Sequence, residues 1–336
     1  MKTYKFLAVA LVATGFFSAC TNEEVVQPVN VNAPAEISFR LQGGTPETRT
    51  LATTLDKLEA FVVYGTDNIV SSPGLLLDGV TVARQLDGTF IYTPKAYYSV
   101  GATSAGFFAF SPVSANVTTP ITTTSLLTTG ASLSYEVIEP DITGNATQED
   151  LLVAWTSVPT SSLTSPVQLT FKHALSRIFV TAKNASDDPV IIKNLTLLNL
   201  AKEGSLSVNT SSALTWTPTT SLGSYEYILA QSGVVVPAKT NTEKLVTSME
   251  QGMMVLPQVT VNTSKDYTSD DFALKVTYDF ANRTNQDQYI YIANGYEFKA
   301  GNQYKISITF DGLNPIEFEV VAIDNFIDDP TVITYP

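Results

Sequence analysis

The chain of 336 residues contains one cysteine and one histidine, Cys20 and His173. A single cysteine excludes an internal disulfide, and zinc sites usually need several cysteine or histidine ligands. Charged residues make up only 15% of the chain, and 32 acidic residues against 19 basic ones give a net charge of −13. Because an acidic surface repels phosphates, we expect no nucleic-acid partner. The glycines form no phosphate-binding loop, and we expect no cofactor.

The lone cysteine ends a segment that has the order of an export signal. Lys2 and Lys5 come first, an apolar run over residues 6–17 follows, and small residues lead to Cys20. The run has about a dozen residues, whereas a spanning helix takes roughly 20. The segment Phe17-Ser18-Ala19-Cys20 resembles the bacterial lipobox, which implies that residues 1–19 are a signal peptide and that acyl chains such as palmitate anchor Cys20. An ordinary secretory signal with a chance cysteine is the alternative.

A short acidic segment follows Cys20 directly. Thr21-Asn22-Glu23-Glu24 resembles the acidic stretch that sends lipoproteins of Bacteroides-type bacteria to the outer surface. This resemblance implies a chain that is anchored in the cell outer membrane and exposed at the surface.

Short β-branched and aromatic runs, separated by Thr, Ser, Asn, Gly and Pro, dominate the rest of the chain. No long stretch shows helical periodicity, so we predict an all-β fold of the β-sandwich type. Residues 35–41 alternate most clearly, with Ile37, Phe39 and Leu41 on one face. Further strands are predicted over residues 61–64, 106–110, 167–171, 178–182, 191–198, 273–280, 289–292, 304–310 and 316–322.

Two polar stretches interrupt this pattern. Residues 156–166 are rich in Ser, Thr and Pro, as expected for a linker or long loop. We therefore predict an N-terminal domain over residues 50–160 and a C-terminal domain over residues 161–336. Residues 114–133 are also rich in Thr and Ser, and we interpret them as a long loop or a β-edge.

Few residues are candidates for a catalytic or metal-binding site. A Ser-His-Asp triad would have to use His173, but this residue ends an alternating strand, and we favour a half-buried strand residue that bonds to a neighbouring loop. Asp324, Asp328 and Asp329 supply the oxygen ligands that calcium takes, but their spacing fits no calcium loop. We interpret them as a solvated turn and expect no metal site.

Aromatic side chains offer a different possibility. Tyr97, Tyr98, Trp155 and Trp216 are the side-chain types that stack on sugars. In a β-rich protein such residues more often belong to the core or to cross-strand pairs, which is the interpretation we favour. If these residues do bind sugars, the chain would be a surface glycan-binding lipoprotein of a polysaccharide-uptake system, which is the alternative function. An enzyme would need two carboxylates that face a shared cleft.

Several segments, taken in order, resemble the fimbrillin family, the subunits of the type V pili of Bacteroides-like bacteria. The most telling match is Phe171–Ile178, with the sequence FKHALSRI. Further matching segments are residues 35–39, 47–50, 97–98, 106–112, 148–154, 254–258 and 304–308. The resemblance covers nearly the whole chain and implies two β-sandwich domains with transthyretin-like Greek-key topology. The family it points to is not enzymatic.

The resemblance also implies how such a chain matures. An arginine-specific protease would cut between Arg49 and Thr50, and residues 20–49 would leave as a propeptide that carries the first strand. The subunit would then join other pilus subunits by strand exchange and become part of a fimbrium that supports adhesion. An unremarkable arginine in a loop is the alternative for Arg49.

The C-terminal residues 313–336 are the expected donor segment in that exchange. Ile316, Phe318 and Val320 share one face of a strand. Apolar residues continue beyond them at Phe326, Ile327, Val332 and Ile333. These residues have the alternative role of completing the chain's own second sandwich. Shaft, tip and anchor roles all stay open.

Overall fold

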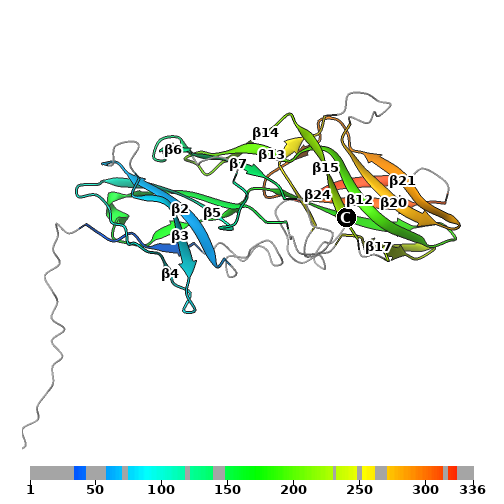
Figure 1. The fold of residues 1–336 in the computed structure, drawn as a ribbon, viewed down its shortest axis with the longest axis horizontal. Coiled ribbons are helices and arrows are strands. Elements are labelled where there is room, and N and C mark those ends of the chain that lie inside the picture. The colour runs from blue at the N-terminus through cyan, green and yellow to red at the C-terminus, as the bar shows by residue number, and fades with distance from the viewer. Residues whose placement is uncertain are drawn as a thin grey trace, which may run out of the picture. The chain divides into compact units, whose positions relative to one another are not determined.

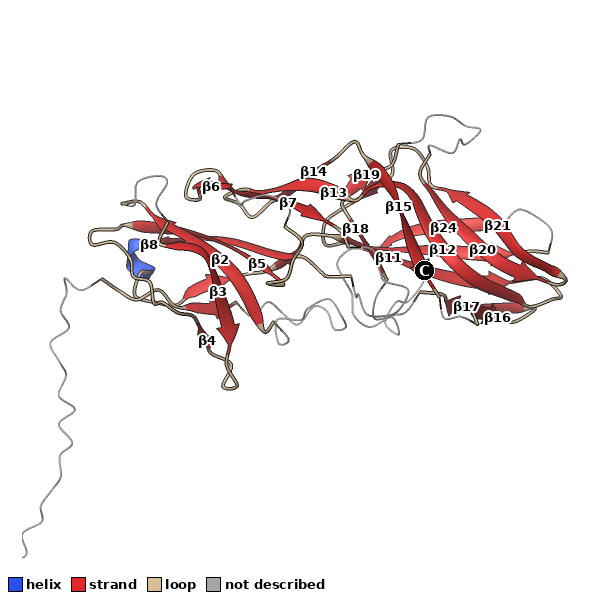
Figure 2. Cartoon of the chain, viewed as in Figure 1, coloured by secondary structure: helices blue, strands red, loops and turns tan. Residues whose placement is uncertain are grey.

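A computed structural model of the chain has, among the residues that it describes, 24 strands, β1 to β24, and a 3-10 helix at Thr160–Ser162. Figure 1 and Figure 2 show their arrangement. The structure describes residues 34–42, 58–69, 75–117, 122–138, 148–229, 232–247, 252–261, 271–312 and 317–323. Within these residues the predicted all-β fold is confirmed. The same residues include no helix with the length and apolar character needed to cross a membrane.

A six-stranded sheet contains most of the strands from the N-terminal half. Its order is β10(Lys172–His173), β8(Leu152–Pro159), β5(Ser104–Ser111), β2(Ala60–Asp67), β3(Leu77–Arg84) and β4(Phe90–Ile91). The central strand β5 is buried on both faces, which explains its unbroken run of apolar residues. Phe107 points into one hydrophobic cluster, whereas Phe108 and Phe110 point into another.

A short parallel ribbon covers the Phe107 face of this sheet. It consists of β1(Phe39–Leu41) and β9(Val167–Leu169), with Phe39 opposite Val167 and Leu41 opposite Leu169. Side chains of both strands pack with Phe61, Val63 and Phe107 in the smaller hydrophobic cluster. This cluster is the core that the first strand helps to build.

A four-stranded sheet packs toward the opposite face of the six-stranded sheet. Its order is β14(Leu214–Pro218), β13(Glu203–Val208), β7(Gly130–Glu136) and β6(Thr122–Ser125). Leu133 and Tyr135 of β7 share the larger hydrophobic cluster with Phe108 and Phe110. Strand β7 pairs with β13 over the register Ala131 to Glu136, so strands from both predicted domains lie in one sheet. The predicted boundary near residue 160 stays a prediction.

Two five-stranded sheets and a short ribbon complete the fold. The first has the order β17(Thr240–Leu245), β11(Ser176–Asn184), β23(Gln303–Phe310) and β24(Glu317–Ile323), with β18(Met253–Val255) also paired to β11. The second has the order β15(Leu222–Ile228), β12(Val190–Ala201), β20(Ala273–Phe280) and β21(Arg283–Tyr291), with β16(Val234–Val236) also paired to β12. The ribbon pairs β19(Gln258–Val259) with β22(Glu297–Phe298). Their apolar faces meet in the larger cluster, where the rings of Tyr278 and Phe310 lie 5.0 Å apart.

Each predicted strand overlaps an observed one, but the interpretation of residues 114–133 as a long loop or edge was wrong in part. Strand β7 lies inside a sheet, between β6 and β13. Its core residues Leu133 and Tyr135 alternate with Ser132 and Ser134, which is the period-2 pattern of a half-buried strand. The Ser- and Thr-rich composition of the whole stretch favoured a loop instead. The polar stretch 156–166 likewise begins inside β8 rather than in a loop.

Candidate functional site

The segment of residues 34–42 fills the centre of the smaller hydrophobic cluster. The side chain of Ile37 is fully buried and that of Phe39 is 5% exposed, whereas Leu41 packs against the cluster from its edge. Arg40 and Gln42 are exposed. An extended backbone places alternate residues on opposite faces, so the alternation predicted from the sequence is confirmed here.

Backbone hydrogen bonds hold this segment on both sides. On one side, the amide of Val167 donates to the carbonyl of Ser38 at 2.7 Å, and that of Gln42 donates to Leu169 at 3.0 Å. On the other side, Ile37 donates to Ala96 at 2.9 Å, and Tyr98 donates to Ala35 at 3.0 Å. The segment is thus inserted between β9 and residues 96–98, with an antiparallel bridge between Glu36 and Tyr97.

The ring of Phe39 is surrounded by other aromatic rings. Its centroid lies 5.9 Å from that of Phe61, 5.8 Å from that of Phe107 and 5.8 Å from that of Tyr92. The contacts with Phe61 and Phe107 are edge-to-face, the arrangement that aromatic quadrupoles favour. The hydroxyl of Tyr92 donates to the carbonyl of Ile37 at 2.6 Å, and burial raises the pKa of this hydroxyl.

Polar contacts on the outward face of the segment are weaker. The ammonium group of Lys95 lies 2.7 Å from the carboxylate of Glu36, and both side chains are 43% exposed. Exposed ion pairs of this kind contribute little to stability. The apolar face and the backbone ladder therefore hold the segment in place.

Removal of residues 34–42 would open a groove with specific properties. It would leave the aromatic side chains around Phe39 exposed to water, together with the backbone groups that now bond the segment from β9 and residues 96–98. Such a groove is a template for another strand with apolar residues at alternate positions. This is the arrangement that strand exchange requires.

The residues predicted to control maturation lie outside the described part of the chain. This applies to Cys20, the predicted lipidation site, and to Arg49 and Thr50, the predicted cleavage site. Leu58, the first described residue after the predicted cut, is fully buried in the smaller cluster.

The predicted donor segment begins with an observed strand. Strand β24 forms the edge of its sheet and pairs antiparallel with β23, with Phe318 opposite Ile308 and Val320 opposite Ile306. Both isoleucines are fully buried. Other predicted donor residues lie outside the described part of the chain, namely Ile316, Phe326, Ile327, Val332 and Ile333.

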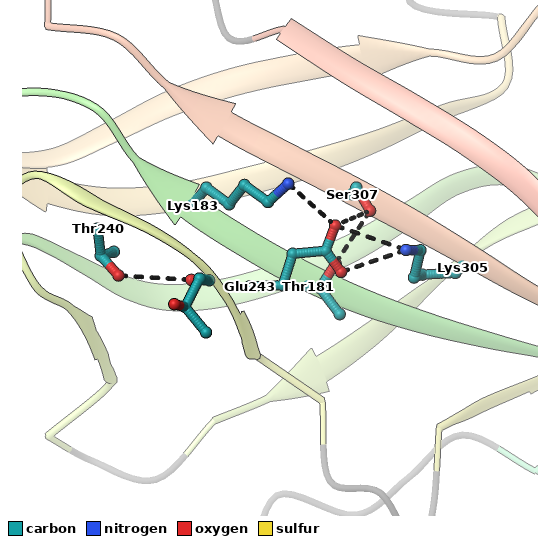
Figure 3. A network of polar contacts seen from close by, with 7 residues as sticks. Thr181, Lys183, Thr240, Glu243, Lys305 and Ser307 are labelled. Atoms are coloured by element: carbon teal, nitrogen blue, oxygen red, sulfur yellow. Dashed lines mark hydrogen bonds and ion pairs between the residues drawn. The ribbon is translucent and has the colours of Figure 1, made fainter. Parts of the chain in front are cut away.

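A polar network connects β17, β11 and β23, three strands of the sheet whose edge is β24 (Figure 3). The carboxylate of Glu243 on β17 accepts hydrogen bonds from Lys305 at 3.2 Å and Ser307 at 3.1 Å on β23, and from Thr181 at 3.3 Å on β11. Partial burial works to raise the pKa of Glu243. The hydrogen bonds from Lys305 and Ser307 and the charges of Lys305 and Lys183 together outweigh it, so that the pKa lies below its ordinary value of 4.5.

The histidine occupies the structural role that we favoured. His173 on β10 is half-buried, and its Nδ1 lies 2.7 Å from Oδ2 of Asp150, in the stretch before β8. The interpretation as a strand residue bonded to a neighbouring loop is confirmed. Among the described residues no cluster of three or more His, Cys, Asp or Glu could hold a metal ion. Asp324, Asp328 and Asp329 lie outside them.

The four aromatic residues considered for sugar binding differ in exposure. Tyr98 is buried in the smaller cluster, and burial raises its pKa to about 12, whereas Tyr97 is 47% exposed. Trp155 and Trp216 are half-buried and pack against the larger cluster. Their indole N–H groups donate to backbone carbonyls, Trp155 to Leu126 at 2.9 Å and Trp216 to Ala174 at 2.7 Å.

Sequence reasoning missed the partners of the first strand. Nothing in the local pattern of residues 96–98 or of Tyr92 indicated that they would bond residues 34–42. The alternation of Phe90 and Tyr92 around Ile91 was the one available signal, because it places both rings on the same face of a strand.

Comparisons with known proteins identify the fold. A fimbrial protein from Bacteroides vulgatus has a similar structure, with a TM-score of 0.59 and 15% sequence identity, over 86% of this chain and 99% of that one. A putative cell adhesion protein from Bacteroides ovatus gives a TM-score of 0.51 and 14% identity, over 89% of this chain and 99% of that one. No curated protein matches the sequence.

The sequence itself settles the family. A family model described as fimbrillin-like matches residues 48–324, which is most of the chain. The match begins one residue before Arg49 and ends one residue after β24. The chain belongs to the fimbrillin-like family.

Proposed function

We propose that this chain is a structural subunit of a surface pilus, and that it polymerises by strand exchange after a protease has cut at Arg49. The insertion of residues 34–42 into the smaller cluster through Ile37 and Phe39 is the observation that carries the proposal. This segment lies N-terminal to Arg49, and it is inserted between two backbone partners with Ile37 and Phe39 in the core. Membership of the fimbrillin-like family supports the pilus role.

The energy scale explains why the segment would stay in place until it is exchanged. Burial of a large apolar side chain stabilises by about 1.5–3 kcal/mol, so Ile37 and Phe39 together contribute on the order of 5 kcal/mol. A cut at Arg49 breaks the covalent tether without removing these contacts. A donor strand from another subunit then competes for the same groove and wins by burying more apolar surface.

The donor is the C-terminal segment that begins with β24. As an edge strand, β24 can leave its sheet by breaking one ladder, the one with β23. The Glu243 network lies on β11, β17 and β23 and continues to join these strands when β24 has left. Donation from the C-terminus of one subunit to the N-terminal groove of the next does not close on itself, so it builds a filament.

Export as a lipoprotein completes the proposal. Acyl chains on Cys20 would hold the uncut chain at the outer membrane, and the cut at Arg49 would free it from this anchor. Mass spectrometry of surface material distinguishes the two states, because the uncut chain begins with lipidated Cys20 and the cut chain begins with Thr50. A glycan-binding lipoprotein that never polymerises would keep Cys20 as its N-terminus.

The test is polymerisation in a purified system. Uncut chain treated with an arginine-specific protease should give a ladder of species that resist SDS. An Arg49→Ala variant should stay monomeric, whereas an Arg40→Ala variant, changed at an exposed arginine nine positions away, should polymerise like the parent. Monomer after complete cutting, or normal ladders from Arg49→Ala, would contradict the proposal.

A further inference from the structure

A groove of about 720 Å³ lies along the outward face of the first strand. Its lining includes Arg40 and Gln42 from β1 and its C-terminal end, Gln168 from β9, Thr170, and Lys172 from β10. The volume falls within the roughly 300–1,000 Å³ of typical ligand pockets. The groove therefore has room for a ligand of several rings.

The groove is positively charged, whereas the chain as a whole is negatively charged. Arg40 and Lys172 are its cations, and its described lining contains no Asp or Glu, although the whole chain carries −13. Both side chains are exposed, and neither forms an ion pair with a described carboxylate. Lys172 donates to a neutral group, the carbonyl of Ser212, at 2.8 Å. Its positive charge stays available to an anion.

The rest of the lining has the chemistry that recognises sugars. Eight serine and threonine residues supply hydroxyl groups that both donate and accept, and Gln42 and Gln168 add amides. Trp155 adds an indole ring, which is held in place by its hydrogen bond to Leu126. Flat aromatic surface next to hydroxyls and amides suits a sugar ring, which has an apolar face and a polar rim.

We propose that this groove binds an acidic oligosaccharide, whose carboxylates pair with Arg40 and Lys172 and whose rings lie along the hydroxyl-lined wall. A linear oligosaccharide longer than this groove could extend into a neighbouring groove. A second groove, of about 1210 Å³, shares Lys172 and Ser212 with the first and includes Trp216 in its lining. Each groove thus has one tryptophan and the shared lysine in its lining.

The site also depends on the first strand, a consequence that rests on the proposed function. Arg40 and Gln42 belong to the segment that leaves after the cut, and Gln42 accepts a hydrogen bond from Thr170 at 3.1 Å. The uncut chain should bind the oligosaccharide more tightly than the cut chain from which the segment has been removed. By thermodynamic linkage, bound oligosaccharide should then shift the equilibrium of the cut chain toward the state in which the strand stays bound.

Calorimetric titration of the uncut chain tests the site directly. A hexamer of galacturonic acid should bind, and a neutral galactose hexamer should bind at least about tenfold more weakly, because charge-assisted hydrogen bonds are worth a factor of this order. A hexaglutamate peptide should also bind more weakly than the acidic sugar. Equal binding of the neutral sugar would reject the role of the cations, and equal binding of the peptide would reject the role of the sugar rings.

Matched variants locate the binding. Arg40→Ala and Lys172→Ala should each weaken binding of the galacturonic acid hexamer by about threefold to tenfold. Lys239→Ala removes the same charge from an exposed lysine that pairs with Asp187 at 2.7 Å, and it should change nothing. An equal loss in all three variants would overturn the proposal. Since the uncut chain is used, a failure to polymerise leaves this result unaffected, and normal polymerisation without sugar binding rejects the groove alone.

Discussion

The hydroxyl of Tyr92 donates a 2.6 Å hydrogen bond to the carbonyl of Ile37, a residue that lies 55 positions earlier in the chain. The same hydroxyl accepts a hydrogen bond of 3.3 Å from the amide of Ala96. One phenol group therefore connects the segment proposed to leave with the backbone stretch that would receive its replacement. Both Ile37 and Tyr92 are buried, so water does not compete for this bond.

The first prediction concerns this hydroxyl. Tyr92→Phe keeps the ring beside Phe39 but leaves the buried carbonyl of Ile37 without its donor, which should lower the free energy of unfolding of the uncut chain by about 1–2 kcal/mol. Urea denaturation measures the difference. Tyr97→Phe, at a side chain that is 47% exposed, should change the free energy by less than about 0.5 kcal/mol. If the two changes lower the free energy of unfolding equally, the hydrogen bond from Tyr92 to the carbonyl of Ile37 does not help to hold the first strand.

The second prediction concerns the anchor residue of the first strand. Phe39→Ala should lower the free energy of unfolding of the uncut chain by about 3–5 kcal/mol, because it removes a ring packed against three others. The neighbouring change Arg40→Ala, at an exposed position, should cost less than about 0.5 kcal/mol. Urea denaturation again provides the measurement.

A cut chain offers an internal control for Phe39. Once residues up to Arg49 have been removed, the Phe39→Ala chain and its parent have identical sequences, and their stabilities should coincide. Any stability difference that the uncut chains show must then come from the first strand in its groove. If Phe39→Ala leaves the uncut chain as stable as the parent, the strand contributes nothing to the core.

The third prediction separates the two roles of the C-terminus. A chain that ends at Ile323 keeps β24 and should fold with near-parental stability, but it should cap filaments rather than extend them. A chain that ends at Gly312 lacks β24 and leaves the edge of β23 open beside the buried Ile306 and Ile308. It should be less stable and prone to aggregation. Size-exclusion chromatography and melting curves compare the two. Undisturbed filament growth by the chain that ends at Ile323 would exclude residues 324–336 as donor, and undisturbed growth by the chain that ends at Gly312 would exclude β24 as well.

Sequence patterns anticipated what the first strand buries but not what it pairs with. The alternation of Ile37, Phe39 and Leu41 is a local signal, and the structure confirms it. The pairing of Phe39 with Val167 joins residues 128 positions apart, and no local pattern encodes a contact of that range. The polar lining of the groove beside Arg40 was equally hidden, because its serines and threonines look like ordinary loop residues in the sequence.

Some features were missed because polar residues resembled a loop. The composition of residues 114–133 predicts a long loop or a β-edge, although Leu133 and Tyr135 hold β7 in the larger cluster. The Glu243 network had no sequence signal at all, since its members come from three strands that are far apart in the chain. Carboxylate and ammonium groups meet there only because β11 pairs with both β17 and β23.

The last prediction uses this network and its dependence on pH. The side chain of Lys305 is only 7% exposed, so Glu243→Gln leaves a buried ammonium without its carboxylate and should cost about 3 kcal/mol at pH 7. The pKa of Glu243 is lowered in the folded chain, so the carboxylate stabilises the fold fully above 4.5, and this contribution is lost as the pH falls through the lowered folded-state pKa. The stability gap between parent and variant should therefore close in acid, as urea denaturation at pH 7 and pH 3 would show. Glu297→Gln, at a side chain that is 57% exposed, should give almost no gap at either pH. A gap for Glu243→Gln that stays constant with pH would mean that packing, not charge, joins these strands.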